Sequence, residues 1–312
     1  MKAMDNIVIR TVIPIFLLIG AGFFSRRMRI LKSGDERVLS AYVYYFALPA
    51  LFFVNLAETV FTPEILTFIF VEIIPIPLSI TFFLLLYFVF RFPKNTFYLL
   101  TLSTIFGSLA FFGIPFITFA FPIEGEHLAT LTSASISIVS VPTSLTILEL
   151  YKLEKSTKLE GIKQVSRRLS KNPLIISVLS GIFLSLIGIE IPTPISAPLH
   201  MLGSTTSTVA IFMLGVFLYG RKYTNIAKAF RLSILRIVFL PTLALLITRL
   251  FGFTGVEGSV LVLMHSMPVA ISMIVLSERY DFYKETVASL ILISSLGAAV
   301  YLNFWLLMLG YF

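Results

Sequence analysis

One stretch of the sequence places polar residues where an apolar segment would normally exclude them. The stretch LVLMHSMPVAISMIVL, residues 261–276, contains His265, Ser266, Pro268 and Ser272. Histidine exchanges a proton near neutral pH, and serine both donates and accepts hydrogen bonds. Proline has no backbone N–H and interrupts helical hydrogen bonding, so neighbouring backbone groups need other partners. These residue types therefore favour a site for a polar ligand or a proton within a broken apolar helix.

A second apolar stretch has a comparable interruption. The stretch STIFGSLAFFGIPFITFAF, residues 103–121, contains Gly107, Gly113 and Pro115. A single proline in an apolar helix more often only kinks it. Kinks are the expected role of five other prolines: Pro49, Pro75, Pro77, Pro142 and Pro241. A matched pair of interruptions instead indicates a binding site, because broken helix ends offer N–H groups to a carboxylate and C=O groups to a cation or to water.

The composition identifies the class of protein. Hydrophobic residues make up 57% of the 312 residues and charged residues 13%, whereas soluble proteins have about 25% charged residues. No cysteine is present, which excludes disulfides and thiol catalysis. The three histidines (His127, His200 and His265) are too far apart for a known metal-binding motif. We therefore expect a membrane protein that has no metal or cofactor and is not an enzyme, since a nucleophile paired with a base is also missing.

The apolar pattern predicts an all-α polytopic protein with ten transmembrane helices. A spanning helix needs about 20 apolar residues. The predicted helices lie near 7–25, 38–57, 65–90, 96–121, 127–150, 173–189, 201–220, 230–250, 257–279 and 286–310. Three helix starts have local signals. Ser33 and Glu36 have the spacing of a capping box, and Thr62-Pro63 and Asn172-Pro173 have the pattern of an N-cap followed by a first-turn proline.

The basic residues predict the orientation. Lysine and arginine concentrate in alternate connections, to which we assign 21 of the 24 basic residues, Arg236 included. Basic connections remain cytoplasmic, so both termini are expected outside a plasma membrane. The net charge of +8 is thereby explained by topology, and no nucleic-acid partner is expected. A general attraction to anionic lipids is compatible with the same pattern.

The longest charged connection divides the chain into halves. Residues 1–150 and 173–312 each hold five predicted helices, and residues 151–172 form a cytoplasmic linker. Because five is odd, the second half must cross the membrane in the opposite sense to the first. This arrangement is the inverted repeat of many secondary transporters, and the two interrupted helices, the fourth and the ninth, then occupy equivalent positions.

Several motifs resemble one family. They are IFLLIGAGFFSRRMRIL and DERVLSAYVYYFALPALFF within residues 15–53, FFGIPF at 111–116, and MPVAISMIVLSERYD at 267–281. Over essentially the whole chain, the sequence resembles the auxin efflux carrier family, within the bile acid/arsenite/riboflavin transporter grouping. The resemblance implies two inverted five-helix repeats whose broken fourth and ninth helices cross at their prolines, here Pro115 and Pro268. It also implies export of a small organic anion such as auxin or a dicarboxylate.

The crossing gives the expected substrate site. We expect the anion to contact residues of both interrupted segments, namely Ser108, Phe112, Gly113, Pro115, Met267, Pro268 and Ser272. The family often has asparagines at the positions of Ser108 and Ser272, and serine is shorter, so substrate identity does not transfer. The sequence pattern places no Arg or Lys at the breaks, which favours a monocarboxylate or weak acid.

Other polar residues have two readings each. Ser133, Ser137, Ser140 and Ser144 form one helical stripe that either lines the substrate path or packs against another helix. His265 either carries a coupling proton or hydrogen-bonds a free backbone group. Glu72 is either a proton or ion carrier, a structural partner, or an interfacial residue.

Two further expectations concern function and assembly. An anion channel could use the same polar stripe, and a membrane receptor or scaffold is the alternative without transport. The short loops argue against a receptor, since none could form a separate signalling domain. The resemblance implies a homodimer through the first, second, sixth and seventh helices. Small residues on these helices permit close packing: Gly20, Gly22, Gly181, Gly203 and Gly215.

Overall fold

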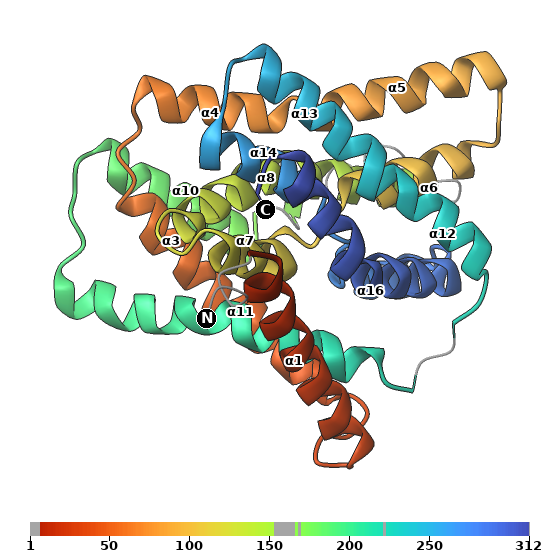
Figure 1. The fold of residues 1–312 in the computed structure, drawn as a ribbon, viewed down its shortest axis with the longest axis horizontal. Coiled ribbons are helices and arrows are strands. Elements are labelled where there is room, and N and C mark those ends of the chain that lie inside the picture. Colours follow the sequence, from red (N-terminus) through yellow and green to blue (C-terminus); the bar gives the residue numbers. More distant parts are fainter. Residues whose placement is uncertain (1–6, 153–165, 168–169, 221–222, 312) are drawn as a thin grey trace.

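The computed structural model describes residues 7–152, 166–167, 170–220 and 223–311, and these form helices throughout (Figure 1). The first half contains α1 (Ile7–Arg27), α2 (Asp35–Tyr42), η1 (Val43–Ala47), α3 (Leu48–Ala57), α4 (Pro63–Ile73), α5 (Pro75–Phe90), α6 (Lys94–Ile105), η2 (Leu109–Gly113), α7 (Ile114–Ala120) and α8 (Gly125–Lys152). The second half contains α10 (Pro173–Leu186), α11 (Thr193–Leu218), α12 (Ile226–Ile234), η4 (Leu235–Phe239), α13 (Leu240–Leu250), α14 (Gly255–His265), α15 (Ser272–Tyr280) and α16 (Lys284–Met308). Most of the predicted linker 151–172 lies outside the described residues.

Six helices are long and apolar enough to cross a membrane, counted over the described part of the chain. They are 35–57, 63–90, 125–152, 193–218, 226–250 and 284–308, with shorter apolar helices at 109–120, 173–186 and 255–265. Large apolar side chains are exposed on several of them, including Phe88 and Phe90 of α5 and Leu250 of α13. Such a surface is stable in lipid rather than in water. The protein is therefore a multi-pass membrane protein.

Two of the three predicted helix starts are confirmed. The Thr62 side chain accepts a hydrogen bond from the Ile65 amide, and Asn172 accepts from the amides of Leu174 and Ile175. The capping box at Ser33 and Glu36 is wrong. Helix α2 instead begins after Gly34, whose φ of 105° favours glycine, and Glu36 accepts from the Gly34 amide.

Three π-helical turns each precede a proline. η1, η2 and η4 lead directly into helices whose second residue is Pro49, Pro115 and Pro241, respectively. A proline cannot donate to the preceding turn and crowds its carbonyl, so a wider turn relieves both problems. The predicted kinks at Pro49 and Pro241 thus take the form of local π-helix.

Helices α1, α3, α10 and α11 pack against one another on one side of the molecule (Figure 1). Glycines bring their backbones close together: a Cβ on Gly22 would lie 2.0 Å from the Phe212 carbonyl oxygen, and one on Gly215 would lie 1.9 Å from that of Ile19. Gly181 and Gly203 likewise face α3. These glycines therefore serve packing within one chain, and they no longer support the expected dimer.

We predict that Gly215→Ala lowers the free energy of unfolding by about 1–3 kcal/mol, because the added methyl forces α1 and α11 apart. The measurement is thermal unfolding of the purified protein in lipid nanodiscs. Gly20→Ala is the matched control, since a Cβ at Gly20 meets nothing within 4 Å. Equal stability of the two variants would contradict the close packing of α1 on α11.

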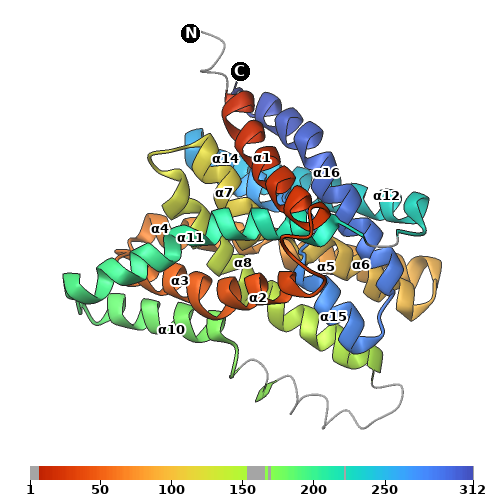
Figure 2. The ribbon, with the colours of Figure 1, turned by 90° about the horizontal axis from the view of Figure 1, so that it is seen from below.

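The start of α1 and the end of α16 lie at the same end of the molecule, and the ends of α8 and α15 lie at the opposite end (Figure 2). Between these ends, the two interrupted segments, α6–α7 and α14–α15, pass through the interior. The fold thus brings both stretches singled out in the sequence into one buried region.

Candidate site at the crossing of two broken helices

The two interrupted segments cross through a pair of backbone hydrogen bonds. The Ser108 amide donates to the Pro268 carbonyl at 2.7 Å, and the Ala270 amide donates to the Phe106 carbonyl at 3.0 Å. These bonds form an antiparallel bridge centred on Gly107 and Val269. The crossing therefore has a fixed register and is not merely a close approach of two kinked helices.

This geometry corrects two expectations. The first segment crosses at Gly107–Ser108, whereas Pro115 lies seven residues beyond Ser108, in α7. The amides of Ser108, Val269 and Ala270 are also not free, since Val269 donates to the Ser294 hydroxyl of α16. In the first turns of the following helices, Leu109–Ala120 and α15, the Met273 and Ile274 amides already donate to the Ala270 and Ile271 carbonyls. The earlier amides of these turns, among them those of Leu109 and Ser272, are the ones placed to offer N–H groups to an anion.

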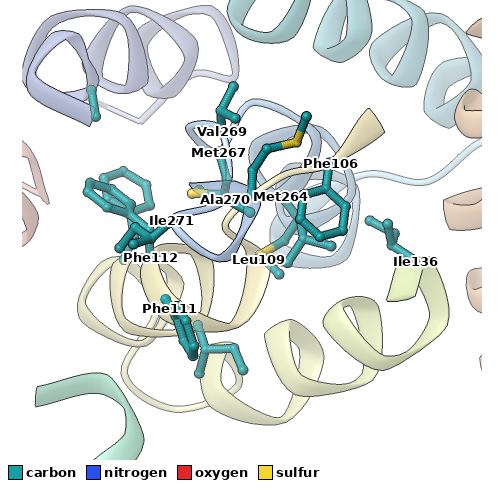
Figure 3. Packing of buried hydrophobic residues seen from close by; sticks show 14 of the residues in the cluster. Phe106, Leu109, Phe111, Phe112, Ile136, Met264, Met267, Val269, Ala270 and Ile271 are labelled. Carbon is teal, nitrogen blue, oxygen red and sulfur yellow. The ribbon is translucent and has the colours of Figure 1, made fainter. Parts of the chain in front are cut away.

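Apolar side chains from both segments pack around the crossing, including Phe112, Met267 and Ile271 (Figure 3). A Cβ on Gly113 would lie 2.8 Å from the Met264 sulfur, so the start of α7 packs tightly on α14. Five of the seven predicted substrate residues, Ser108, Phe112, Gly113, Met267 and Pro268, are thus brought together at the crossing. Their roles as ligands stay predictions.

Two serines lie at the crossing in different environments. Ser108 is buried, and its hydroxyl has no hydrogen-bond partner among the described residues. Ser272 begins α15 and is half-buried. A buried hydroxyl without a partner costs about 1–3 kcal/mol, so it is a natural place for a polar ligand to bind.

A fully buried arginine also reaches the crossing, which corrects the expectation that no basic residue lies there. Arg236 is 1% exposed and belongs to η4, although the charge pattern assigned it to a cytoplasmic connection. Its Nε donates to the Met267 carbonyl at 2.7 Å, and its Nη1 donates to the Thr104 carbonyl at 2.8 Å. The preference for a monocarboxylate therefore loses its basis.

The two candidates for ion coupling lie next to each other. Glu72 Oε1 is 3.4 Å from His265 Nδ1, and both side chains are buried. His265 Nδ1 also lies 2.9 Å from the Leu261 carbonyl, as expected for a satisfied structural histidine. The Glu72 oxygens and His265 Nε2 have no hydrogen-bond partner in the part of the chain that the structure describes. A buried acid and a buried histidine this close are coupled in their protonation, which makes the pair a candidate for carrying a proton.

The serine stripe lies on α8, which packs against the crossing. Ser133, Ser140 and Ser144 are buried and Ser137 is half-buried. The hydroxyls of Ser133 and Ser144 have no hydrogen-bond partner among the described residues. If the stripe served only helix packing, these hydroxyls would need no partner. The lining of a substrate path by this stripe stays a prediction.

Comparisons with known proteins agree on one class. Residues 7–306 match the family described as "Membrane transport protein". The chain is 26% identical to the uncharacterized transporter YfdV of Escherichia coli (strain K12), over 94% of this chain and 95% of that protein. It is 25% identical to the uncharacterized transporter MJ1031 of Methanocaldococcus jannaschii, over 94% and 96%. A putative malonate transporter of Rhizobium meliloti is 27% identical over 42% of each chain.

Proposed function

Because the chain belongs to the membrane transport protein family, the auxin efflux carriers, we propose that it is a secondary transporter that exports a small organic anion. The observation that carries this proposal is the buried backbone bridge between Gly107 and Val269. A discontinuous pair of helices persists inside a bilayer only where other protein or a water-filled cavity meets its backbone groups, since lipid cannot hydrate them. Carriers of this kind bind solutes at such breaks.

The transport cycle we propose is alternating access around the crossing. The ten helical segments form two inverted five-helix repeats, in which α6–α7 and α14–α15 are the fourth and ninth helices. One carboxylate of the substrate binds at the first turns of Leu109–Ala120 and α15, beside the Ser108 hydroxyl. The name of the Rhizobium relative supports a short carboxylate, and malonate is therefore the first probe.

We further propose that the Glu72–His265 pair carries a proton with the anion. A carboxylate and an imidazole 3.4 Å apart, both enclosed, are stable only if they share or neutralise their charge. Gaining or losing a proton therefore changes how the pair interacts with its surroundings. This change can favour one orientation of the carrier over the other.

The experiment that tests the transport function is counterflow in proteoliposomes. Vesicles loaded with unlabelled malonate should transiently concentrate labelled malonate from outside, because a carrier exchanges solutes whereas a channel only equilibrates them. Accumulation above the equilibrium level supports the carrier. Flux without such accumulation supports an anion channel, and absence of flux with malonate, acetate, succinate and indole-3-acetate supports a protein without transport function.

The proposed topology gives a separate prediction. With no native cysteine, single introduced cysteines report sidedness cleanly. In intact cells, Ile123→Cys, which is 97% exposed between α7 and α8, should react with a membrane-impermeant maleimide. Ser33→Cys, in the basic connection after α1, should react only after permeabilisation. Labelling in the reverse order would contradict cytoplasmic basic loops and outward termini.

The homodimer is likewise a proposal. It now rests mainly on the family resemblance, because four of the five glycines expected to support it, Gly22, Gly181, Gly203 and Gly215, pack within one chain. The mass of the protein in lipid nanodiscs tests it, and a monodisperse monomer would contradict it.

A further inference from the structure

Arg236 joins the two broken helices at their carbonyl ends. Met267 follows the end of α14 and Thr104 lies in the last turn of α6, and their carbonyl oxygens accept hydrogen bonds from Nε and Nη1 of the guanidinium. The carboxyl end of a helix carries partial negative charge, which a cation stabilises. One side chain from a third segment, η4, therefore holds both carbonyl ends at the crossing.

The third guanidinium nitrogen has no such partner. Nη2 of Arg236 is buried and has no hydrogen-bond acceptor among the described residues. It occupies the space beside Gly107, where a Cβ would lie only 1.6 Å away. Glycine at position 107 is thus what allows the guanidinium to reach the crossing, next to Ser108, whose hydroxyl is also buried without a partner.

Among the described residues, no carboxylate pairs with Arg236. The close acid–base pairs there join Glu58 to His200, Glu72 to His265 and Asp281 to Lys284. His265 and Tyr301 interact electrostatically with Arg236, and neither is a carboxylate. An enclosed charge without a counter-ion is strongly unfavourable, so this region is short of one negative charge.

We propose that Arg236 is the residue that selects an ionised carboxylate at the crossing. Its Nη2 donates to one carboxylate oxygen of the substrate, and its charge is balanced by that carboxylate. Planar guanidinium and carboxylate groups match well in geometry, and such charge-assisted hydrogen bonds are the strong ones. This inference rests on the proposed function, since it assigns the charge preference of the same site.

A purely structural arginine, one that only holds the two carbonyl ends together, gives a different result. Its removal would weaken the binding of charged and neutral ligands alike. Removal of a selecting arginine weakens the binding of the charged ligand more than that of the neutral one. The distinguishing quantity is therefore the preference for an acid over its neutral amide, and not the affinity for either one.

The experiment measures binding of malonate and malonamide to purified protein in lipid nanodiscs, by thermal-shift titration at fixed pH and salt. Acetate with acetamide and indole-3-acetate with indole-3-acetamide serve as further pairs. The parent should prefer at least one acid over its amide by about 100-fold, the size expected when a buried charge loses its partner. Arg236→Gln should lose this preference. Arg249→Gln, an exposed arginine at the end of α13, is the matched control and should behave as the parent.

Arg236→Lys keeps the charge and should keep most of the preference, and it serves where Arg236→Gln does not fold. The inference is overturned if either the parent shows no preference for any acid, or Arg236→Gln retains the parental preference, or a folded Arg236→Lys loses it. Failure of the proposed transport function gives a different result. In that case acids would bind with the stated preference, but malonate counterflow would be absent.

Discussion

Gly107→Ala is expected to reduce malonate binding and transport by about 100-fold. The new methyl would lie 1.6 Å from Nη2 and 2.3 Å from Cζ of Arg236, so the guanidinium must leave its position. The end of an exposed arginine could swing aside, but this one is 1% exposed and is bonded to two carbonyls. Its displacement breaks a buried charged contact, which costs about 2–5 kcal/mol.

The matched control is Gly297→Ala in α16. There the nearest atom to an added Cβ is 3.6 Å away on the Tyr301 ring, an ordinary contact distance. We expect this variant to bind and transport malonate as the parent does, and both variants should be recovered as folded protein. Parental affinity in Gly107→Ala would show that the position of Arg236 at the crossing is irrelevant to the substrate.

Glu72→Gln is expected to abolish accumulation of malonate driven by a pH difference. With the membrane potential held at zero, a carrier that moves one proton with each anion can concentrate the anion up to about tenfold per pH unit. Glutamine has nearly the same shape as glutamate but cannot carry the proton. The variant should therefore exchange malonate in counterflow and reach no net accumulation, and His265→Gln should behave in the same way.

The exposed pair formed by Glu58 and His200 is the control for this prediction. Its atoms are 3.0 Å apart and both side chains are about half exposed, so water screens their interaction. Glu58→Gln should accumulate malonate as the parent does. If Glu72→Gln also accumulates it to the parental level, the buried pair does not carry the coupling proton.

The helices were largely predictable because lipid imposes strong rules on the sequence. Each of the ten predicted ranges contains a helix or a broken helix, since apolar length and basic connections are long-range patterns. Local geometry was less predictable. The glycine start of α2 replaced the expected capping box, and α11 begins at Thr193, ahead of the predicted residue 201. The residue at which a helix begins depends on one or two side chains and on contacts with neighbouring helices.

The candidate site was predictable only in part. The two interruptions indicated the crossing, but the proline of the first one did not mark the point of contact, because a π-turn absorbs Pro115 within the helix. Arg236 was missed because charge counting grouped it with the basic connection and the start of the adjoining helix. The signal was present in the sequence: Arg236 lies among apolar residues in SILRIVFLP, ten residues after the start of α12. A charge at that depth indicates a function.

The pairing of Glu72 with His265 could not be predicted from the sequence either. Each residue was a separate candidate, and 193 positions separate them along the chain. Their contact depends on the packing of both α4 and α14 against α8, and no local pattern determines that packing. The structure thereby turns two weak candidates into one testable pair.

The central claim is that the anion binds at the crossing, and the Michaelis constant for malonate counterflow of Ser108→Ala tests it most directly. Alanine keeps the Cβ of serine but cannot hydrogen-bond through its side chain, and the Ser108 backbone bond to Pro268 needs no side chain. We predict that the Michaelis constant rises at least tenfold, about the value of one lost hydrogen bond to a charged group, in a variant that is folded and inserted. An unchanged Michaelis constant in Ser108→Ala would contradict binding at the crossing.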